Sequence, residues 1–190
     1  MKTSFISILK QAGISWSDIS SFFYKRIIPA HTTLLYEGDI ARNIYFISKG
    51  ALRLWNNDDG RDITFQFFFE NQIVSSFESF YLEEESIFSI ESLEETALYV
   101  LSKKNLNLLL EKYPVVNDLF TRAIAERFMD YSKYFLSRIK ETPEERYSSL
   151  VQQNSIILNR VPNYYIASYL GITPVSYSRI KKRLEKNGRN

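Results

Sequence analysis

The feature that most constrains the fold is a long run without a helix-breaking residue in the second half of the chain. Residues 115–142 contain neither Gly nor Pro, and Pro114 just before them suits the first turn of a helix. Apolar side chains recur within the run at spacings of mostly three and four, which predicts one long amphipathic helix. Its apolar stripe consists of Val116, Phe120, Ala123, Ile124, Phe128, Tyr131, Phe135 and Ile139. The stripe can pack on the chain's own preceding region or on a second copy of the helix, and we favour the second copy.

The region before this helix has a short, strand-like pattern from about residue 27 to residue 110. Runs of β-branched and aromatic residues alternate with turn residues such as Glu37-Gly38-Asp39 and Asp58-Asp59-Gly60. Short strands that are separated by turns roughly every 8–12 residues are typical of an all-β sandwich or barrel. We expect strands at residues 33–36, 44–47, 51–55, 63–69 and 90–101, followed by an amphipathic helix over residues 103–113.

Composition excludes several kinds of chemistry. Of the 190 residues 45% are hydrophobic and 24% are charged, which indicates a globular chain. The absence of Cys removes disulfides, thiolate catalysis and iron–sulfur ligation. His31 is the only His, so the sequence offers neither a cluster of metal ligands nor a Ser–His pair, and it has no Gly-rich phosphate loop. We therefore expect no catalytic activity, no resident metal and no haem.

The sequence also predicts a cytoplasmic protein that does not bind membranes. It has no stretch of 18 apolar residues. Met1–Gly13 carries one Lys before a short apolar patch and lacks a small-residue cleavage site, so we interpret it as a first helix and not as a signal peptide.

Charge is distributed unevenly along the chain. Residues 140–190 hold nine Lys or Arg and four Glu, a net charge of +5, whereas residues 1–139 hold fifteen basic and eighteen acidic residues, a net charge of −3. A basic C-terminal part attracts a polyanion, although ordinary surface charge would give the same count.

The C-terminal part begins with a capping box and then shows a helix-turn-helix. Thr142-Pro143-Glu144-Glu145 predicts a helix through about Gln152. Further on, Ala167 is small where a second helix must approach, and Gly171 suits a turn that needs positive φ. Thr173 can cap the second helix. The positions expected in the shared core are Ile166, Leu170, Ile172, Tyr177 and Ile180.

The second of these helices has the composition of a DNA-reading helix. Six of the twelve residues from Arg179 to Asn190 are Arg or Lys. A helix fits the major groove of DNA, and its cations neutralise phosphates. Arg179 can pair with a guanine edge, and Val175, on the same face, can contact a thymine methyl. Ser176 and Lys182 are predicted phosphate contacts. The full set of predicted DNA-binding residues is Asn163, Thr173, Pro174, Val175, Ser176, Ser178, Arg179, Lys182 and Arg183.

Over nearly its whole length the chain resembles the Crp/Fnr family of transcriptional regulators. Leu35-Tyr-Glu-Gly-Asp39, Ile44-Tyr-Phe-Ile-Ser-Lys-Gly50 and Leu52-Arg-Leu54 resemble its effector-domain strands, and Ile166-Ala-Ser-Tyr-Leu-Gly-Ile-Thr-Pro174 with Ser178-Arg179 resembles its DNA-reading motif. The resemblance implies an α+β protein with a cyclic-nucleotide-binding-like β jelly roll (a double-stranded β-helix), a long dimerisation helix and a C-terminal winged-helix-like helix-turn-helix. Within that motif Arg179 matches the residue that reads a guanine. The sequence ends at Asn190, so we expect a truncated wing.

The chain departs from the family where its members bind cyclic nucleotide. Those members carry a Gly-Glu pair and, some ten residues later, an Arg followed by Ser or Thr, whereas this chain has Ser75-Ser76 and Ser86-Ile87 at the matching places. Residues 62–102 contain nine carboxylates, expected to be a solvated surface, and no Lys or Arg; Arg53 is the one substitute cation we identify. We expect no tight binding of cyclic AMP. The candidate effector pocket consists of Arg53, Val74, Ser75, Ser76, Phe77, Ser86 and Ile87. The aromatic residues Phe67, Phe68, Phe69, Phe77, Phe80 and Phe88 either line an apolar pocket or form core.

The sequence therefore predicts three parts: an effector domain over residues 1–112, a dimerisation helix and linker over 113–140, and a DNA-binding domain over 141–190. The predicted partners are double-stranded DNA, a second copy of the chain and RNA polymerase. The alternative is a non-catalytic ligand-sensing or protein-interaction jelly-roll module with an incidental basic tail.

Overall fold

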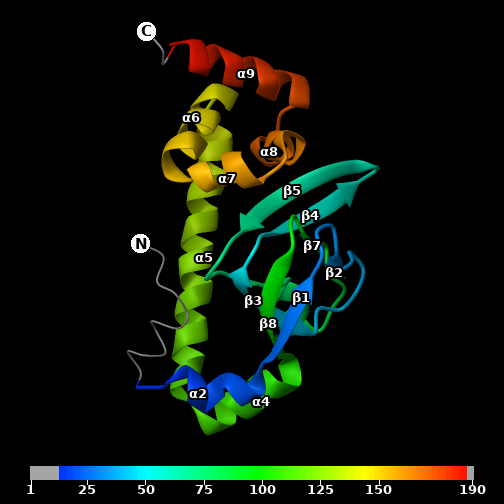
Figure 1. Cartoon of the computed structure of the whole chain (residues 1–190), viewed down its shortest axis with the longest axis vertical. Helices are drawn as coiled ribbons and strands as arrows, with labels where there is room; N and C mark the ends of the chain where they lie inside the picture. The colour runs from blue at the N-terminus through cyan, green and yellow to red at the C-terminus, as the bar shows by residue number, and fades with distance from the viewer. Residues whose placement is uncertain (1–12, 188–190) are drawn as a thin grey trace.

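A computed structural model of the chain describes residues 13–187. The long helix α5 (Val115–Lys140) runs along one side of an elongated molecule (Figure 1). Two β-sheets lie beside it, and the helices α6 to α9 gather at its C-terminal end. The N-terminal helix expected over Met1–Gly13 lies outside the described residues, apart from Gly13 itself, which is in a turn.

The β-strands form two four-stranded antiparallel sheets. One sheet has the order β1 (Tyr24–Ile28), β8 (Thr96–Ser102), β3 (Asn43–Lys49), β6 (Ile73–Val74), and the other has the order β2 (Thr33–Leu35), β7 (Ser89–Ser92), β4 (Leu52–Asp58), β5 (Arg61–Phe68). The two sheets confirm the α+β class and the jelly roll. The single strand expected over residues 90–101 is wrong, because the chain bends at Leu93 and the two halves pair in different sheets.

The two faces of the β2-β7-β4-β5 sheet bury different side chains. Leu52, Leu54 and Ile90 point inward and form the core between the sheets. Arg53 and Glu91 are register partners, and with Phe67 they lie on the opposite face. This alternation follows from the two-residue period of a strand. A Cβ on Gly50 would lie 2.7 Å from the Cα of Thr96, so only Gly fits where the turn between β3 and β4 meets the start of β8.

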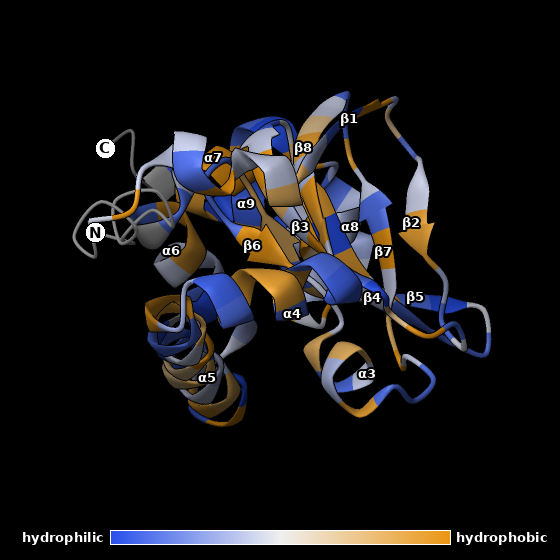
Figure 2. Cartoon of the chain, turned by 90° about the horizontal axis from the view of Figure 1, so that it is seen from below, coloured by the Kyte–Doolittle hydropathy of each residue, from blue (hydrophilic) through white to orange (hydrophobic). Residues whose placement is uncertain are grey.

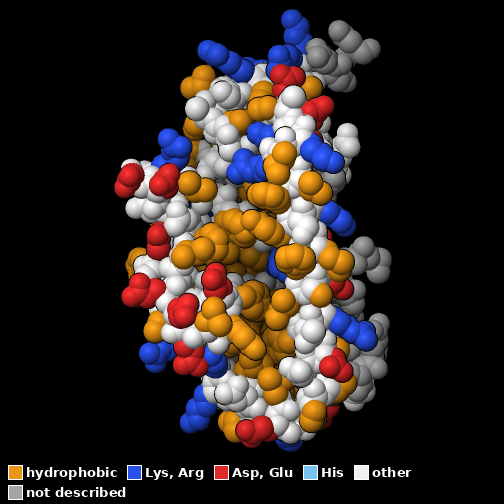
Figure 3. All heavy atoms as spheres, turned by 180° about the vertical axis from the view of Figure 1, so that it is seen from behind, with side chains coloured by type: hydrophobic (Ala, Val, Ile, Leu, Met, Phe, Trp, Pro, Cys, Tyr) orange, Lys and Arg blue, Asp and Glu red, His pale blue; other side chains and the backbone are white. Residues whose placement is uncertain are grey.

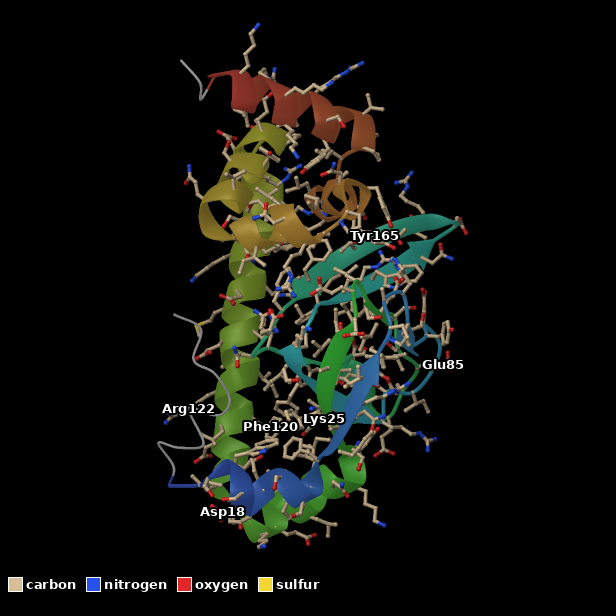
Figure 4. The ribbon with its side chains drawn as sticks, in the orientation of Figure 1. Asp18, Lys25, Glu85, Phe120, Arg122 and Tyr165 are labelled. Atoms are coloured by element: carbon tan, nitrogen blue, oxygen red, sulfur yellow. The ribbon has the colours of Figure 1, made fainter. Side chains whose placement is uncertain are left out.

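Short helices close the lower end of the jelly roll in Figure 1: α2 (Trp16–Ile19) with the 3₁₀ turn η1 (Ser20–Phe22), and α4 (Lys103–Lys112). Helix α3 (Phe77–Leu82) follows β6. Leu109 of α4 and Val116 and Phe120 of α5 are buried in the inter-sheet core. Figure 4 shows Phe120 directed toward the sheets and Arg122 directed away from them. Seen end-on in Figure 2, α5 stands beside the sheets, and the stripe residues from its later turns are exposed: Ile124, Phe128, Tyr131, Phe135 and Ile139.

Four helices follow α5: α6 (Pro143–Gln153), α7 (Ser155–Arg160), α8 (Asn163–Leu170) and α9 (Pro174–Asn187). The predicted capping box is present: the Glu145 amide donates to the Thr142 hydroxyl (3.3 Å), and the Thr142 amide donates to the Glu145 carboxylate (2.7 Å). Helix α7 was not predicted, because six residues are too few for a clear apolar period.

A second core joins these helices to the jelly roll. It contains Ala51, Phe67, Phe69 and Leu93 from the β-region together with ten buried residues of α6 to α9 and their connections. Helix α4 ends at Lys112 and helix α5 ends at Lys140, and the division into three parts at these positions stays a prediction. The second core contains residues from both sides of residue 140. The C-terminal helices therefore pack directly on the outer face of the sheet.

Candidate DNA-binding surface

Helices α8 and α9 form the predicted helix-turn-helix. Gly171 ends α8 with φ +69°, the left-handed conformation that Gly adopts most readily. The Gly171 amide donates to the Ser168 carbonyl (2.9 Å) and the Ile172 amide to the Ala167 carbonyl (3.0 Å), which caps α8. Ala167 is fully buried. Of the positions expected in the shared core, Ile166, Leu170, Tyr177 and Ile180 are buried and Ile172 is half-buried.

The first turn of α9 uses its hydroxyl groups locally. The Ser176 amide donates to the Thr173 hydroxyl (3.1 Å), so Thr173 is the predicted cap, and the two hydroxyl groups lie 3.0 Å apart. The Ser178 hydroxyl donates to the Pro174 carbonyl (3.0 Å). Thr173 and Ser178 remain exposed and Ser176 is half-buried. These three side chains therefore shape the start of α9, whatever else they contact.

The outer face of α9 carries the residues expected to read DNA. Pro174, Val175, Arg179 and Lys182 are exposed. In Figure 1 this helix lies at the end of the molecule farthest from α2 and α4. Asn163 is exposed at the start of α8.

Arg183 has a partner that the sequence analysis did not foresee. Its guanidinium pairs with the Glu144 carboxylate on α6. Both side chains line a groove of about 460 Å³ between the start of α6 and α9, together with Thr142, Pro143, Ile172, Ser176, Arg179 and Ile180. A DNA phosphate that reaches Arg183 must share this cation with Glu144.

Two of the predicted effector-pocket serines, Ser76 and Ser86, bond to each other. Ser75, Ser76 and Ser86 are buried. The Ser86 and Ser76 hydroxyl groups are 2.8 Å apart, and the Ser86 hydroxyl also lies 2.7 Å from the Phe88 carbonyl. The Ser75 hydroxyl donates to the Asn43 carbonyl (3.0 Å). Val74 is fully buried, Phe77 is half-buried at the start of α3, and Ile87 points to solvent.

The suggestion that Arg53 supplies a cation for a bound effector is wrong. Its guanidinium is buried on the outer face of the sheet, where it donates to Glu91 (2.7 and 2.9 Å) and to Asp62 (2.6 Å). Burial alone would lower the Arg53 pKa, but the hydrogen bonds to Asp62 and Glu91 outweigh it and raise the pKa. The Tyr165 ring of α8 lies 3.6 Å from the guanidinium carbon, and Figure 4 shows Tyr165 between α8 and the β4–β5 strands.

The acidic stretch is more than a solvated surface. Five of its nine carboxylates pair with cations from outside the stretch: Asp62 and Glu91 with Arg53, Glu70 and Glu94 with Arg160, and Glu83 with Lys103. The predicted aromatic set also divides. Phe68 and Phe80 belong to the inter-sheet core, with Phe77 and Phe88 packed against it, and Phe67 and Phe69 belong to the second core.

Several contacts that fix the helix-turn-helix on the sheet were not predicted. The Thr64 amide of β5 donates to the Ser168 hydroxyl (2.8 Å), which itself donates to the Asp62 carbonyl (2.7 Å). Arg160 of α7 pairs through two nitrogens with Glu70. No local pattern marks Ser168, because its partner is the backbone of a strand more than 100 residues away.

Comparison with known proteins agrees with this architecture. Residues 25–113 match the family model of the cyclic nucleotide-binding domain. A search of curated proteins finds no significant match. The fold is that of Crp/Fnr-type transcriptional regulators, as the sequence resemblance implies.

Three solved structures illustrate the likeness. A CooA mutant from Carboxydothermus hydrogenoformans has a TM-score of 0.77 at 12% identity, over 99% of this chain and 87% of that one. The c-di-GMP-responsive regulator CLP from Xanthomonas campestris has a TM-score of 0.74 at 16% identity, over 88% and 89%. A protein described as a crp/fnr-family transcriptional regulator, from Eubacterium rectale, has a TM-score of 0.72 at 18% identity, over 95% and 87%. At these identities the likeness establishes the fold.

Proposed function

We propose that this chain is a DNA-binding transcriptional regulator of the Crp/Fnr type. The observation that carries the proposal is the exposed face of α9, with Val175, Arg179 and Lys182 at the far end of the molecule. An α-helix of this kind fits the major groove, and its first two turns meet the base edges. No helix within residues 13–187 has the length and apolarity to cross a membrane. We expect the protein to be cytoplasmic, non-catalytic and able to contact RNA polymerase when bound to DNA.

Two residues of α9 have different proposed roles. Arg179 reads a base: a two-pronged Arg–guanine contact discriminates against a wrong base by about 1–3 kcal/mol. Lys182 lies three residues further on and binds a phosphate, which adds affinity for every sequence alike. Val175, four residues before Arg179, contacts a thymine methyl from the same face.

The protein acts as a homodimer through α5. Ile124, Phe128, Tyr131, Phe135 and Ile139 recur every three or four residues along the helix, and each is at least 41% exposed. In Figure 3, hydrophobic side chains extend along α5 and between this helix and the sheets. A second α5 covers such a stripe in a two-stranded packing. The two α9 helices then read half-sites about one DNA turn, roughly 34 Å, apart.

We expect that this protein does not bind cyclic AMP tightly, because the residues that hold the nucleotide in cyclic-nucleotide-binding family members are replaced here. Of the serines at the matching places, Ser76 and Ser86 bond to each other and Ser75 donates to the Asn43 carbonyl, and Arg53 is paired with Glu91 and Asp62. A buried cyclic phosphate would therefore lack the cation that its burial requires.

Selection of bound genomic DNA followed by sequencing identifies the operator. Fluorescence anisotropy then measures the affinity of each variant for operator DNA and for random DNA, which tests the roles of Arg179 and Lys182. Arg179→Ala should reduce the ratio of operator to random-DNA affinity by roughly 5–150-fold, the equivalent of about 1–3 kcal/mol. The matched control Lys182→Ala should weaken both DNAs alike and lower the salt slope by about one unit. An unchanged affinity ratio in Arg179→Ala contradicts the assigned reading face. If the wild-type protein leaves DNA unbound at low salt, the interaction-module alternative replaces this proposal.

A further inference from the structure

A second cavity lies at the junction of the sheet, the long helix and the DNA-binding helices. It has a volume of about 450 Å³, and β5, α5, α6, α7 and α8 all contribute to its wall. Small-molecule sites have volumes of roughly 300–1,000 Å³ and occur preferentially where domains meet. None of the predicted effector-pocket residues lines this cavity. It is therefore a separate site.

Aromatic rings form much of the wall. Phe65 and Phe67 come from β5, Tyr131 and Tyr134 from α5, and Tyr169 from α8. Tyr134 and Tyr169 are nearly parallel, with ring centroids 5.0 Å apart, and Phe67 lies 5.3 Å from Tyr169. The Tyr134 hydroxyl donates to the backbone carbonyl of Tyr169 (2.8 Å), which fixes the Tyr134 ring against α8. Such a wall favours a flat aromatic ligand, because aromatic rings attract one another in offset-stacked and edge-to-face arrangements.

The charged groups of the cavity balance. Asp130 and Glu141 provide two carboxylates, and Lys133 and Arg146 provide two cations. Arg146 donates to the Glu141 and Leu170 carbonyls, so it is committed to the wall. Burial raises the pKa of both Tyr134 and Tyr169, so both phenols stay neutral. A ligand without net charge suits this environment. Gln66 on β5 and Asn154 before α7 offer amide groups to its polar edge.

We propose that this junction cavity binds a small, planar, uncharged aromatic molecule and that the bound molecule fixes α8 and α9 on β5. A molecule that contacts β5, α5 and α8 together favours the docked arrangement, because only that arrangement brings the three walls together. The argument that the cavity binds a ligand depends only on the geometry of the cavity. The expected effect of the ligand on DNA affinity rests on the proposed function.

N-phenyl-1-naphthylamine, a neutral aromatic dye whose fluorescence rises in apolar surroundings, is a suitable probe. It should bind the full-length protein at one site per chain. Ser149→Phe on the α6 wall and Gln66→Phe on the β5 wall should each raise the dissociation constant at least about tenfold, since a phenyl ring fills part of the volume. The matched control Ser155→Phe adds the same ring to an exposed position outside the lining and should leave the dye affinity within twofold.

Circular dichroism shows whether each variant is folded. Hydrogen exchange of the wild-type protein, with and without saturating dye, tests the site without any substitution. Slower exchange in β5, α6 and α8 supports the site. Absence of dye binding, or binding that both filled variants retain, overturns it. The effect on DNA is measured separately. If the protein binds dye but not DNA, the proposed function fails and the site stands. If it binds both and the dye changes DNA affinity less than twofold, the regulatory part of the proposal is overturned.

Discussion

Replacing Arg53 by Met removes the cation at the contact between the sheet and the DNA-binding helices. Arg53 is 2% exposed and Glu91 is 9% exposed, so the Glu91 carboxylate that loses the guanidinium stays largely out of water and keeps only the His31 ring, 3.4 Å away, as an ion-pair partner within residues 13–187. Asp62 matters less, because 37% of its side chain is exposed. Met keeps an apolar stem of similar length under the Tyr165 ring. The variant therefore tests the charge more than the volume.

The expected loss in the free energy of unfolding follows from the burial of this ion pair. Removing one partner of a buried ion pair destabilises a protein by about 3–5 kcal/mol, because the other charge is left uncompensated. A typical total stability is about 5–15 kcal/mol, so the loss is a large fraction of it. For a chain of this length each kcal/mol lowers the melting temperature by about 2–4 °C, which gives a decrease of about 6–20 °C.

A double-mutant cycle with Glu91→Leu isolates the interaction. Glu91→Leu alone should also destabilise strongly, since among residues 13–187 it leaves the Arg53 guanidinium with Asp62 and Thr64 as polar partners. The double variant removes both charges and should lie within about 2 kcal/mol of the wild-type protein. Urea unfolding followed by circular dichroism at fixed protein concentration measures the three differences.

Two outcomes refute this reasoning. A cost below about 1 kcal/mol for Arg53→Met would show that the guanidinium is solvated, as exposed ion pairs are. A double variant as unstable as the sum of the two single variants would show that Arg53 and Glu91 do not interact.

Three further predictions concern the effector, the dimer and the sheet–helix contact. Isothermal titration with cyclic AMP should give no dissociation constant in the low micromolar range or tighter, and a tighter value contradicts our interpretation of the serine substitutions. Phe128→Asp should shift light scattering from a dimer to the 22.4 kDa chain at micromolar concentration, since it places a charge in the exposed apolar stripe of α5; a wild-type protein that is monomeric with and without DNA rules the dimer out. Arg160→Gln should destabilise the protein by about 1 kcal/mol at pH 7, a value reduced because the ion pair is about one-third exposed. The Arg160 hydrogen bond holds the Glu70 pKa at about 2 instead of 4.5, so the wild-type advantage should be complete above pH 4.5 and disappear as the pH falls toward 2, as urea unfolding at pH 7, 4.5 and 3 measures. An advantage that persists at low pH, or an equal loss in the exposed control Arg61→Gln, contradicts the assignment.

Local patterns were sufficient to predict most of the elements. The three- and four-residue spacing predicted α5, the capping box predicted the start of α6, and Gly171 predicted the turn before α9. Each of these signals acts between residues close in sequence, where backbone geometry decides the outcome. The two-residue alternation along β4 explains why Arg53 faces away from Leu52 and Leu54, a direction that the sequence analysis did not assign. It does not say what Arg53 meets there.

The tertiary structure decided the partners across long separations. Arg53 meets a carboxylate 38 residues away, Arg160 one 90 residues away, and Ser168 a backbone amide 104 residues away. Periodicity shows which face of an element is buried, but any buried face of suitable shape can be its partner. The sequence pattern therefore determined a β-sandwich or barrel, a long helix and a helix-turn-helix, and the family resemblance implied that the β-region is a jelly roll. Only the packing of α8 on the outer face of β5 decided that the Tyr165 ring covers the Arg53 guanidinium, because that contact exists only once both parts have folded.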